Sequence, residues 1–204
     1  GICKVVCYSP NHGLTLPLME IDAIEEVIRL WKNEYKNLGN SPEINHVQIF
    51  ENKGAVMGCS NSHPHGQIWA QRSIPQEVQK KIIQQKNYWD KQGSSLLGDY
   101  LKQEFESGER IILENNTFVA LIPYWAVGPY ATMIVPKRHV ISISELSEQE
   151  VHDYAKILQK LTIRYDNLFE TSFPYSAGIH QAPTNGEDNK YWHMHMSFYP
   201  PLLR

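Results

Sequence analysis

Apolar residues recur at helical spacing in two long segments of the chain. In residues 21–38, apolar side chains occupy every third or fourth position and charged side chains lie between them. Residues 148–168 have the same pattern, and Ser147 followed by Glu150 matches a helix-capping box. The pattern therefore predicts two long amphipathic helices, each with one face buried against the rest of the protein.

Short runs rich in β-branched and aromatic residues, bounded by glycine, proline and asparagine, predict β-strands. The predicted strands cover residues 2–8, 45–51, 63–69, 111–113, 117–123, 131–135, 175–180 and 191–199. Two more helices, over 75–92 and 100–106, are predicted between them. Because three strands follow one another without a helix, we expect an antiparallel sheet flanked by the long helices, which is an α+β fold.

The two halves of the chain repeat one order of features: a strand, a proline and a histidine, a long helix, a strand, a polar loop, and a strand with His-x-His. His12 and His139 are 127 residues apart, and the two long helices begin at the same separation. His63 and His193 are 130 residues apart. These matching separations predict a tandem duplication of one α+β unit.

We place the first repeat at residues 1–106 and the second at residues 107–204. The first repeat has Gly-Gln after its histidine pair, whereas the second has Met-Ser there. The second repeat is therefore expected to be catalytically degenerate. The chain also begins directly in a strand and ends without a closing element, so we expect a piece of a longer protein whose first repeat is incomplete at its N-terminus.

The polar motif His-Pro-His-Gly-Gln-Ile-Trp at residues 63–69 carries the candidate chemistry. Alternate side chains of a strand share a face, so His63, His65 and Gln67 are predicted to point the same way. The loop before them, residues 52–61, has two glycines and several amide and hydroxyl groups. Backbone N–H groups of such a loop can approach an anion closely. Together the loop and the strand predict a phosphate-binding reaction centre.

Composition excludes several other classes of protein. The chain is 42% hydrophobic and 20% charged, as expected for a globular protein with a sizeable core. A net charge of -3 predicts no general affinity for nucleic acid or anionic membranes, and no apolar run approaches the ~20 residues that span a bilayer. The cysteines, Cys3, Cys7 and Cys59, lack metal-type spacing and suit a reducing compartment, so we expect a cytoplasmic protein. Cys59 lies in the loop and is a second candidate nucleophile.

These motifs resemble the duplicated branch of the histidine-triad superfamily, the galactose-1-phosphate uridylyltransferases. The most specific matches are residues 50–54 (Phe-Glu-Asn-Lys-Gly), 58–61 (Gly-Cys-Ser-Asn), 63–69 and 198–204. Further matches extend over essentially the whole chain. The resemblance implies two tandem histidine-triad-like repeats, a cytoplasmic homodimer, and a chain that continues beyond both ends.

The resemblance also implies a two-step exchange of a uridylyl group between UDP-glucose and galactose 1-phosphate. His65 matches the family's nucleophile, and a neutral imidazole is competent in that role at pH 7. Gln67 can donate hydrogen bonds to phosphate but cannot carry a proton, which favours transfer over hydrolysis. Gln67 and Ser60 are the other expected catalytic residues. The expected substrate-binding residues are Phe50, Asn52, Gly58, Cys59, Ser60 and Gln67.

Two metal sites are implied in the same way. His12 and His63 match two of four zinc ligands, the other two being expected upstream of this chain. A second metal, iron or zinc, has four ligands in some members, and His180 and His195 match two of them. Lys81 and Ser197 stand in the other two places. We therefore predict that this second site is empty or rebuilt.

Two alternative functions remain open from the sequence. A dinucleoside-polyphosphate phosphorylase or adenylyltransferase of the same superfamily also uses His-x-His-x-Gln. A non-catalytic nucleotide-binding fragment would explain the altered second metal site. The choice of sugar and the subunit arrangement are not determined by these residues.

Overall fold

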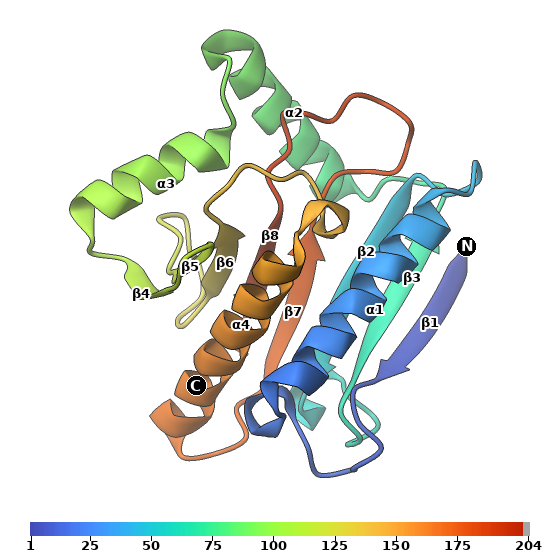
Figure 1. Cartoon of the computed structure of the whole chain (residues 1–204), viewed down its shortest axis with the longest axis vertical. Helices are drawn as coiled ribbons and strands as arrows, with labels where there is room; N and C mark the ends of the chain where they lie inside the picture. The colour runs from blue at the N-terminus through green and yellow to red at the C-terminus, as the bar shows by residue number, and fades with distance from the viewer. Residues whose placement is uncertain (202–204) are drawn as a thin grey trace.

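Figure 1 shows the computed structural model of the chain, in which residues 1–201 are described. Its strands are β1 (Ile2–Cys7), β2 (His46–Lys53), β3 (His65–Gln71), β4 (Ile111–Glu114), β5 (Phe118–Leu121), β6 (Thr132–Pro136), β7 (Tyr175–His180) and β8 (His195–Tyr199). Its α-helices are α1 (Ile21–Gly39), α2 (Gln76–Gln92), α3 (Leu96–Ser107) and α4 (Glu148–Phe169), and the short helix η2 (Ala55–Met57) precedes β3. Within residues 1–201, none of these helices has the length and apolar character needed to cross a membrane.

Each predicted helix and strand has a counterpart in the structure, with two notable shifts of boundary. The last predicted strand begins only at His195, because the residues before it form turns. The helix predicted from residue 100 begins earlier, at Leu96. Ser95 caps this helix by accepting a hydrogen bond from the Gly98 N–H at 2.9 Å. The final matching motif reaches residues 202–204, which lie outside the described residues.

The strands form one antiparallel sheet with the order β1-β3-β2-β7-β8-β6-β5-β4. The order is symmetric about the β2–β7 pair, because β1-β3-β2 on one side is matched by β6-β8-β7 on the other. This arrangement confirms the predicted α+β fold of two tandem repeats. The sheet continues across both repeats, and the border between residues 106 and 107 stays a prediction.

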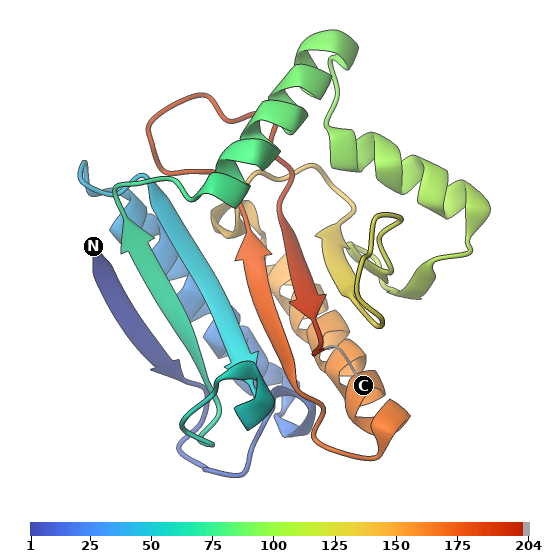
Figure 2. The same cartoon turned by 180° about the vertical axis from the view of Figure 1, so that it is seen from behind.

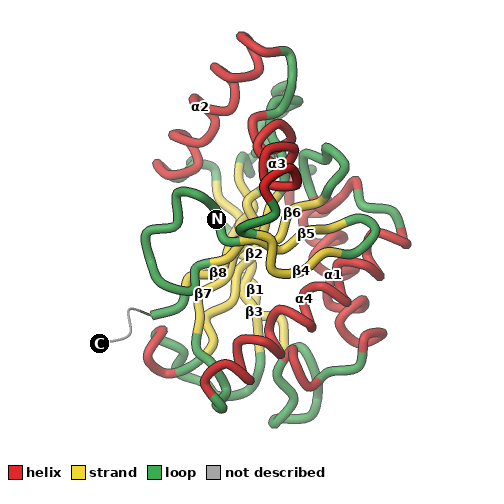
Figure 3. Tube along the Cα trace, turned by 90° about the vertical axis from the view of Figure 1, so that its left-hand side faces the viewer, coloured by secondary structure: helices red, strands yellow, loops and turns green. Residues whose placement is uncertain are grey.

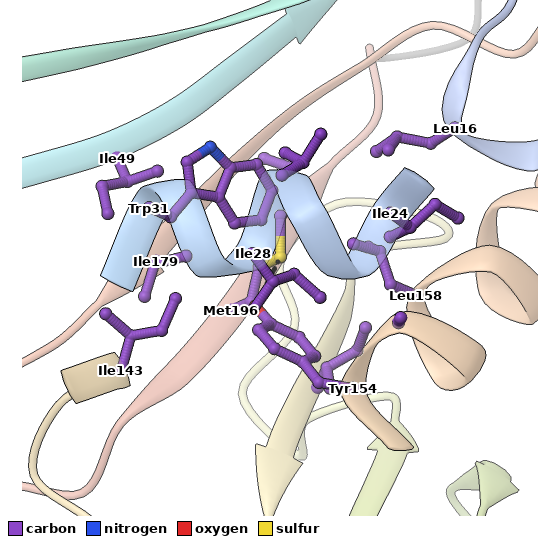
Figure 4. Close-up of a cluster of buried hydrophobic side chains, with 14 of the residues drawn as sticks. Leu16, Ile24, Ile28, Trp31, Ile49, Ile143, Tyr154, Leu158, Ile179 and Met196 are labelled. Carbon is purple, nitrogen blue, oxygen red and sulfur yellow. Dashed lines mark hydrogen bonds between the residues drawn. The ribbon is translucent and has the colours of Figure 1, made fainter. Parts of the chain in front are cut away.

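The two long helices, α1 and α4, lie side by side against one face of the sheet (Figures 1 and 3). The close-up in Figure 4 shows Ile28 and Trp31 of α1 together with Tyr154 and Leu158 of α4 and Met196 of β8. All five side chains are at most 3% exposed. Burying a large apolar side chain contributes about 1.5–3 kcal/mol, so this layer holds both helices firmly on the sheet.

The opposite face of the sheet differs between the repeats (Figure 2). Over the second repeat, Leu97 and Leu101 of α3 pack on Met133 and Val135 of β6. Over the first repeat, every second residue of β3 and of β2 from Gln48 to Asn52 is only half-buried or exposed, while the residues between them are buried. This accessible side of β2 and β3, called here the free face, carries the histidine motif.

Glu51 of β2 is a buried carboxyl on the helix side of the sheet. It is 6% exposed, and its Oε2 accepts hydrogen bonds from the hydroxyls of Tyr8 at 3.4 Å and Tyr175 at 3.3 Å. Burial disfavours the charged form more strongly than these donors favour it, and raises the pKa of Glu51 to about 7. The folded protein therefore keeps a proton on Glu51 at pH values where the unfolded chain has lost it.

We expect the effect of Glu51→Gln on the free energy of unfolding to be about 2–3 kcal/mol more favourable at pH 8 than at pH 5. The folded-state pKa of Glu51 lies above its ordinary value of 4.5, so wild-type stability falls as the pH rises from 4.5 through about 7. Each unit of this difference corresponds to about 1.4 kcal/mol, and glutamine removes the dependence. Urea unfolding at both pH values measures it, with the exposed Glu109→Gln as control. Parallel pH profiles for Glu51→Gln and wild type would contradict the assignment.

Candidate active site

His65 is the first residue of β3 and lies on the free face, opposite Cys7 of β1. Its Nδ1–H donates a hydrogen bond to the carbonyl oxygen of His63 at 2.7 Å. This bond places the ring proton on Nδ1 and leaves a lone pair on Nε2. The half-buried ring is therefore held in one tautomer, with the lone pair on Nε2.

His63 lies before β3, so the prediction that this strand begins at residue 63 is wrong, and strand alternation does not place the His63 ring. The hydrogen-bond ladder of β3 cannot extend through Pro64, which has no N–H. The Pro64 carbonyl instead accepts a hydrogen bond from the Tyr8 N–H at 3.1 Å. The chain bends at His63, and its ring contacts the Ser9 carbonyl and His12.

His63 lies next to His12, the other residue predicted to bind zinc. The His63 Nε2–H donates to the carbonyl oxygen of Ser9 at 2.8 Å, so its Nδ1 carries a lone pair. This Nδ1 lies 2.9 Å from the Nδ1 of His12. Two nitrogen ligands of a tetrahedral zinc ion lie about 3.3 Å apart, so the pair fits half of a zinc site after a small adjustment. Among residues 1–201, no group of three or more histidine, cysteine or acidic residues is arranged to hold a metal.

Gln67 follows His65 on the same face of β3 and pairs with Phe50 of β2. The Trp69 Nε1–H donates a hydrogen bond to Gln67 Oε1 at 3.3 Å, which leaves the amide NH₂ group free to donate. Phe50 meets the Trp69 ring edge-on, with centroids 5.2 Å apart. Sequence reasoning gave no role to Trp69, although strand alternation from Gln67 was the signal that places it on this face.

The loop before β3 folds through two glycines with positive φ, Gly54 at 90° and Gly58 at 82°. The N–H groups of Met57, Gly58 and Cys59 donate to carbonyl groups at the start of the loop. These three N–H groups are engaged within the loop, so fewer backbone donors are available to an anion than the sequence predicts. Ser60, which follows them, is exposed and keeps its hydroxyl accessible.

Two further predicted residues are held by side-chain hydrogen bonds. The Cys59 thiol donates to the carbonyl oxygen of Asn61 at 3.0 Å. A thiol engaged as a donor is not in the thiolate form that a nucleophile requires, which weighs against Cys59 in that role. Asn52 Oδ1 accepts a hydrogen bond from the Ser176 hydroxyl at 2.5 Å, at the junction of β2 and β7.

The residues predicted for a second metal site meet on the other half of the sheet. His180 and His195 are cross-strand partners with stacked rings, their centroids 4.9 Å apart. Lys81 Nζ lies 3.3 Å from His195 Nε2. Burial lowers the pKa of Lys81 to about 8 and holds the pKa of each histidine well below its ordinary value. With an amine in place of a carboxylate, these groups do not fit a four-ligand metal site.

The fold and the motif define a histidine-triad-like protein built from two repeats on one sheet. Sequence comparison matches residues 1–75 to the N-terminal domain and residues 81–204 to the C-terminal domain of galactose-1-phosphate uridyl transferase. The chain belongs to the galactose-1-phosphate uridyl transferase family.

Several relatives and solved structures are similar over the full chain. Galactose-1-phosphate uridylyltransferases of Haemophilus influenzae and Rattus norvegicus are 53% and 45% identical over the whole chain, which covers 58% and 54% of their lengths. A solved uridylyltransferase has a TM-score of 0.91 at 26% identity, covering 97% of this chain and 63% of that one. An ADP-glucose phosphorylase from Arabidopsis thaliana has the same TM-score and identity, covering 100% of this chain and 65% of that one. The chain thus spans less than two thirds of each.

Proposed function

We propose that the protein exchanges uridylyl groups between UDP-glucose and galactose 1-phosphate through a covalent uridylyl-histidine on His65. The observation that supports this most directly is the hydrogen bond of 2.7 Å from His65 Nδ1 to the His63 carbonyl. This hydrogen bond leaves Nε2 of His65 unprotonated on the free face. The loop that precedes the strand carries the accessible hydroxyl of Ser60. Membership of the family supports the choice of substrates.

In the first step, the lone pair of His65 Nε2 attacks the uridine-bound phosphorus of UDP-glucose. A nitrogen–phosphorus bond forms, the bond from that phosphorus to the bridging oxygen breaks, and glucose 1-phosphate leaves with the electron pair. The positive charge that develops on the ring is stabilised by the His63 carbonyl at Nδ1–H. In the second step, a phosphate oxygen of galactose 1-phosphate attacks the same phosphorus, UDP-galactose leaves, and neutral His65 is restored.

Gln67 and Ser60 are proposed to stabilise the phosphate charge during both steps. The Gln67 Oε1 already accepts a hydrogen bond from Trp69, so the amide NH₂ is the group that can donate to a phosphate oxygen. An amide has no accessible pKa and cannot activate water as a general base. In either direction of the exchange the group that leaves when His65 attacks is a sugar phosphate, glucose 1-phosphate from UDP-glucose or galactose 1-phosphate from UDP-galactose. Such a group needs little protonation, so an amide suffices and transfer is favoured over hydrolysis. Phe50 and Asn52 are proposed to lie along the uridine and its phosphates.

Zinc is proposed to bind His12 and His63, together with two ligands beyond residues 1–204. When bound, zinc would supply structural cross-linking and no chemistry at phosphorus. The Ser9 carbonyl already sets the tautomer that a metal requires at His63. A link between His12 and His63 would hold the carbonyl of His63, which orients the proposed nucleophile. We also propose a cytoplasmic homodimer, on the basis of the family resemblance.

The test is to trap the covalent intermediate in the protein at its native length. UDP-glucose labelled at the uridine-bound phosphorus is added without galactose 1-phosphate. We expect up to one label per reactive site on His65 and an equal amount of released glucose 1-phosphate. Adding galactose 1-phosphate should then discharge the label as UDP-galactose.

The alternative functions give different results in the same experiment. A phosphorylase or adenylyltransferase would take label from a dinucleoside polyphosphate or ADP-glucose in preference to UDP-glucose. A non-catalytic binding protein would bind UDP-glucose without any acid-labile, covalently held label. Either result would overturn the proposed exchange.

A further inference from the structure

The histidine pair of the second repeat repeats the hydrogen bonds of the first. His193 Nε2–H donates to the Pro136 carbonyl at 2.9 Å, as His63 does to the Ser9 carbonyl. His195 Nδ1–H donates to the His193 carbonyl at 3.0 Å, as His65 does to His63. Both repeats therefore leave the same two lone pairs free, on Nδ1 of the first histidine and on Nε2 of the second.

In the second repeat, the α2–α3 hairpin reaches one of these lone pairs through Ser95. The Ser95 hydroxyl lies 2.9 Å from His193 Nδ1, and its oxygen also accepts the Gly98 N–H at 2.9 Å. Because the oxygen is already an acceptor from the backbone, its own proton is available for His193. The equivalent nitrogen in the first repeat is the one that faces His12.

The same hairpin reaches the other lone pair through Lys81. Its Nζ lies 3.3 Å from His195 Nε2, the nitrogen equivalent to the reactive Nε2 of His65. Since the His195 proton is on Nδ1, the lysine is the donor. His180 stacks on His195, and its own Nε2 is buried without a hydrogen-bond partner among the described residues.

We propose that the α2–α3 hairpin is an internal plug of the second repeat. Lys81 supplies a built-in cationic donor at His195, and Ser95 supplies a hydroxyl at His193. These groups occupy the positions at which an imidazole lone pair would otherwise bind a metal ion or attack phosphorus. Lys81 and His195 line a cavity of about 470 Å³, so the space beside them is open while the two lone pairs themselves are engaged. Neither nitrogen is then available to a metal ion or to phosphorus, and α2 is fixed to β8 without a metal. This inference holds whether or not His65 is the nucleophile.

The test converts the plug into a metal site. In Lys81→Glu combined with Ser197→His, a carboxylate replaces the amine, and a new imidazole lies two residues from His195 on the same face of β8. We expect this variant to bind one more zinc ion per chain than wild type, counted by mass spectrometry after dialysis. The matched control, Lys80→Glu with Ser197→His, makes the same charge change at the neighbouring position, where the side chain is 60% exposed. It should gain no additional ion.

The wild-type protein provides a second measurement that requires no variant to fold. Co²⁺ is added to the wild-type protein at one equivalent per proposed zinc site, the site of His12 and His63. The NMR signals of the His180 and His195 rings should then stay unbroadened. Broadening of these signals would show a metal at the pair and would overturn the plug. An equal gain of zinc in both double variants, or no gain in the Lys81→Glu variant when it is folded, would overturn it too.

Discussion

His65→Asn should reduce uridylyl exchange by at least about 10⁴-fold, because it removes the only atom proposed to form a bond to phosphorus. The asparagine amide can keep the hydrogen bond that Nδ1 makes to the His63 carbonyl, but it has no nucleophilic nitrogen. UDP-glucose binding should change far less than turnover, since the residues proposed for uridine and phosphate lie on β2, in the loop between β2 and β3, and at Gln67, and all of them are unchanged. Exchange of labelled glucose 1-phosphate into UDP-glucose measures turnover, and equilibrium binding of UDP-glucose measures affinity.

The matched control is the same substitution at the equivalent position of the second repeat, His195→Asn. Its exchange rate per folded molecule should stay within about threefold of wild type, because Lys81 already occupies the reactive nitrogen there. Thermal melting gives the folded fraction of each variant. Comparable loss of exchange in both variants, or substantial exchange in His65→Asn, would contradict the assignment of the chemistry to His65.

Gly66→Ala should destabilise the protein by about 1–3 kcal/mol and lower exchange, although it adds only a methyl group. A Cβ at Gly66 would lie 2.5 Å from the Tyr8 hydroxyl oxygen and 3.2 Å from the Tyr8 ring. Tyr8 is 6% exposed, and its ring packs edge-on against Trp31 with centroids 6.1 Å apart. The ring therefore cannot move aside freely, and β3 must shift next to His65. For a chain of this size, each kcal/mol lowers the melting temperature by about 2–4 °C.

A double-mutant cycle with Tyr8→Phe isolates this contact. Removing the hydroxyl removes the closest atom, so Gly66→Ala should cost less in the Tyr8→Phe background than in wild type. Gly13→Ala serves as control, because its nearest neighbour would be 3.6 Å away. Additive effects of Gly66→Ala and Tyr8→Phe would show that this contact is not the cause.

Local periodicity was enough to predict the secondary structure and part of the site. The stripe of α1 and the alternation of β3 depend on neighbours a few positions away, and so does the shared face of His65 and Gln67. The wrong start of β3 has a local cause too, because the missing N–H of Pro64 ends the strand. The missing N–H of Pro64 is visible in the sequence. Whether it ends a strand depends on whether a neighbouring strand lies beside it.

Other features could not be predicted because they depend on contacts between distant segments. The need for glycine at position 66 is one of them, because its φ is not positive and what it provides is space for Tyr8. Ser95 meets His193 across 98 residues of sequence, and Lys81 meets His195 across 114. No spacing rule links such pairs, since their approach is decided by how α2 and α3 pack over the sheet.

The pairing of β2 with β7 makes the two repeats a single cooperative folding unit. Ile49 of β2 pairs with Ile68 of β3 on one side and with Ile179 of β7 on the other. The strand that carries His65 is therefore separated from the second repeat by one strand only. Losing β7 would turn β2 into an edge strand and expose its hydrogen-bonding groups. The stability of the second repeat thus bears on how much of the His65 strand is kept folded. We expect destabilising substitutions in β7 or β8 to lower the amount of folded protein without touching the residues around His65.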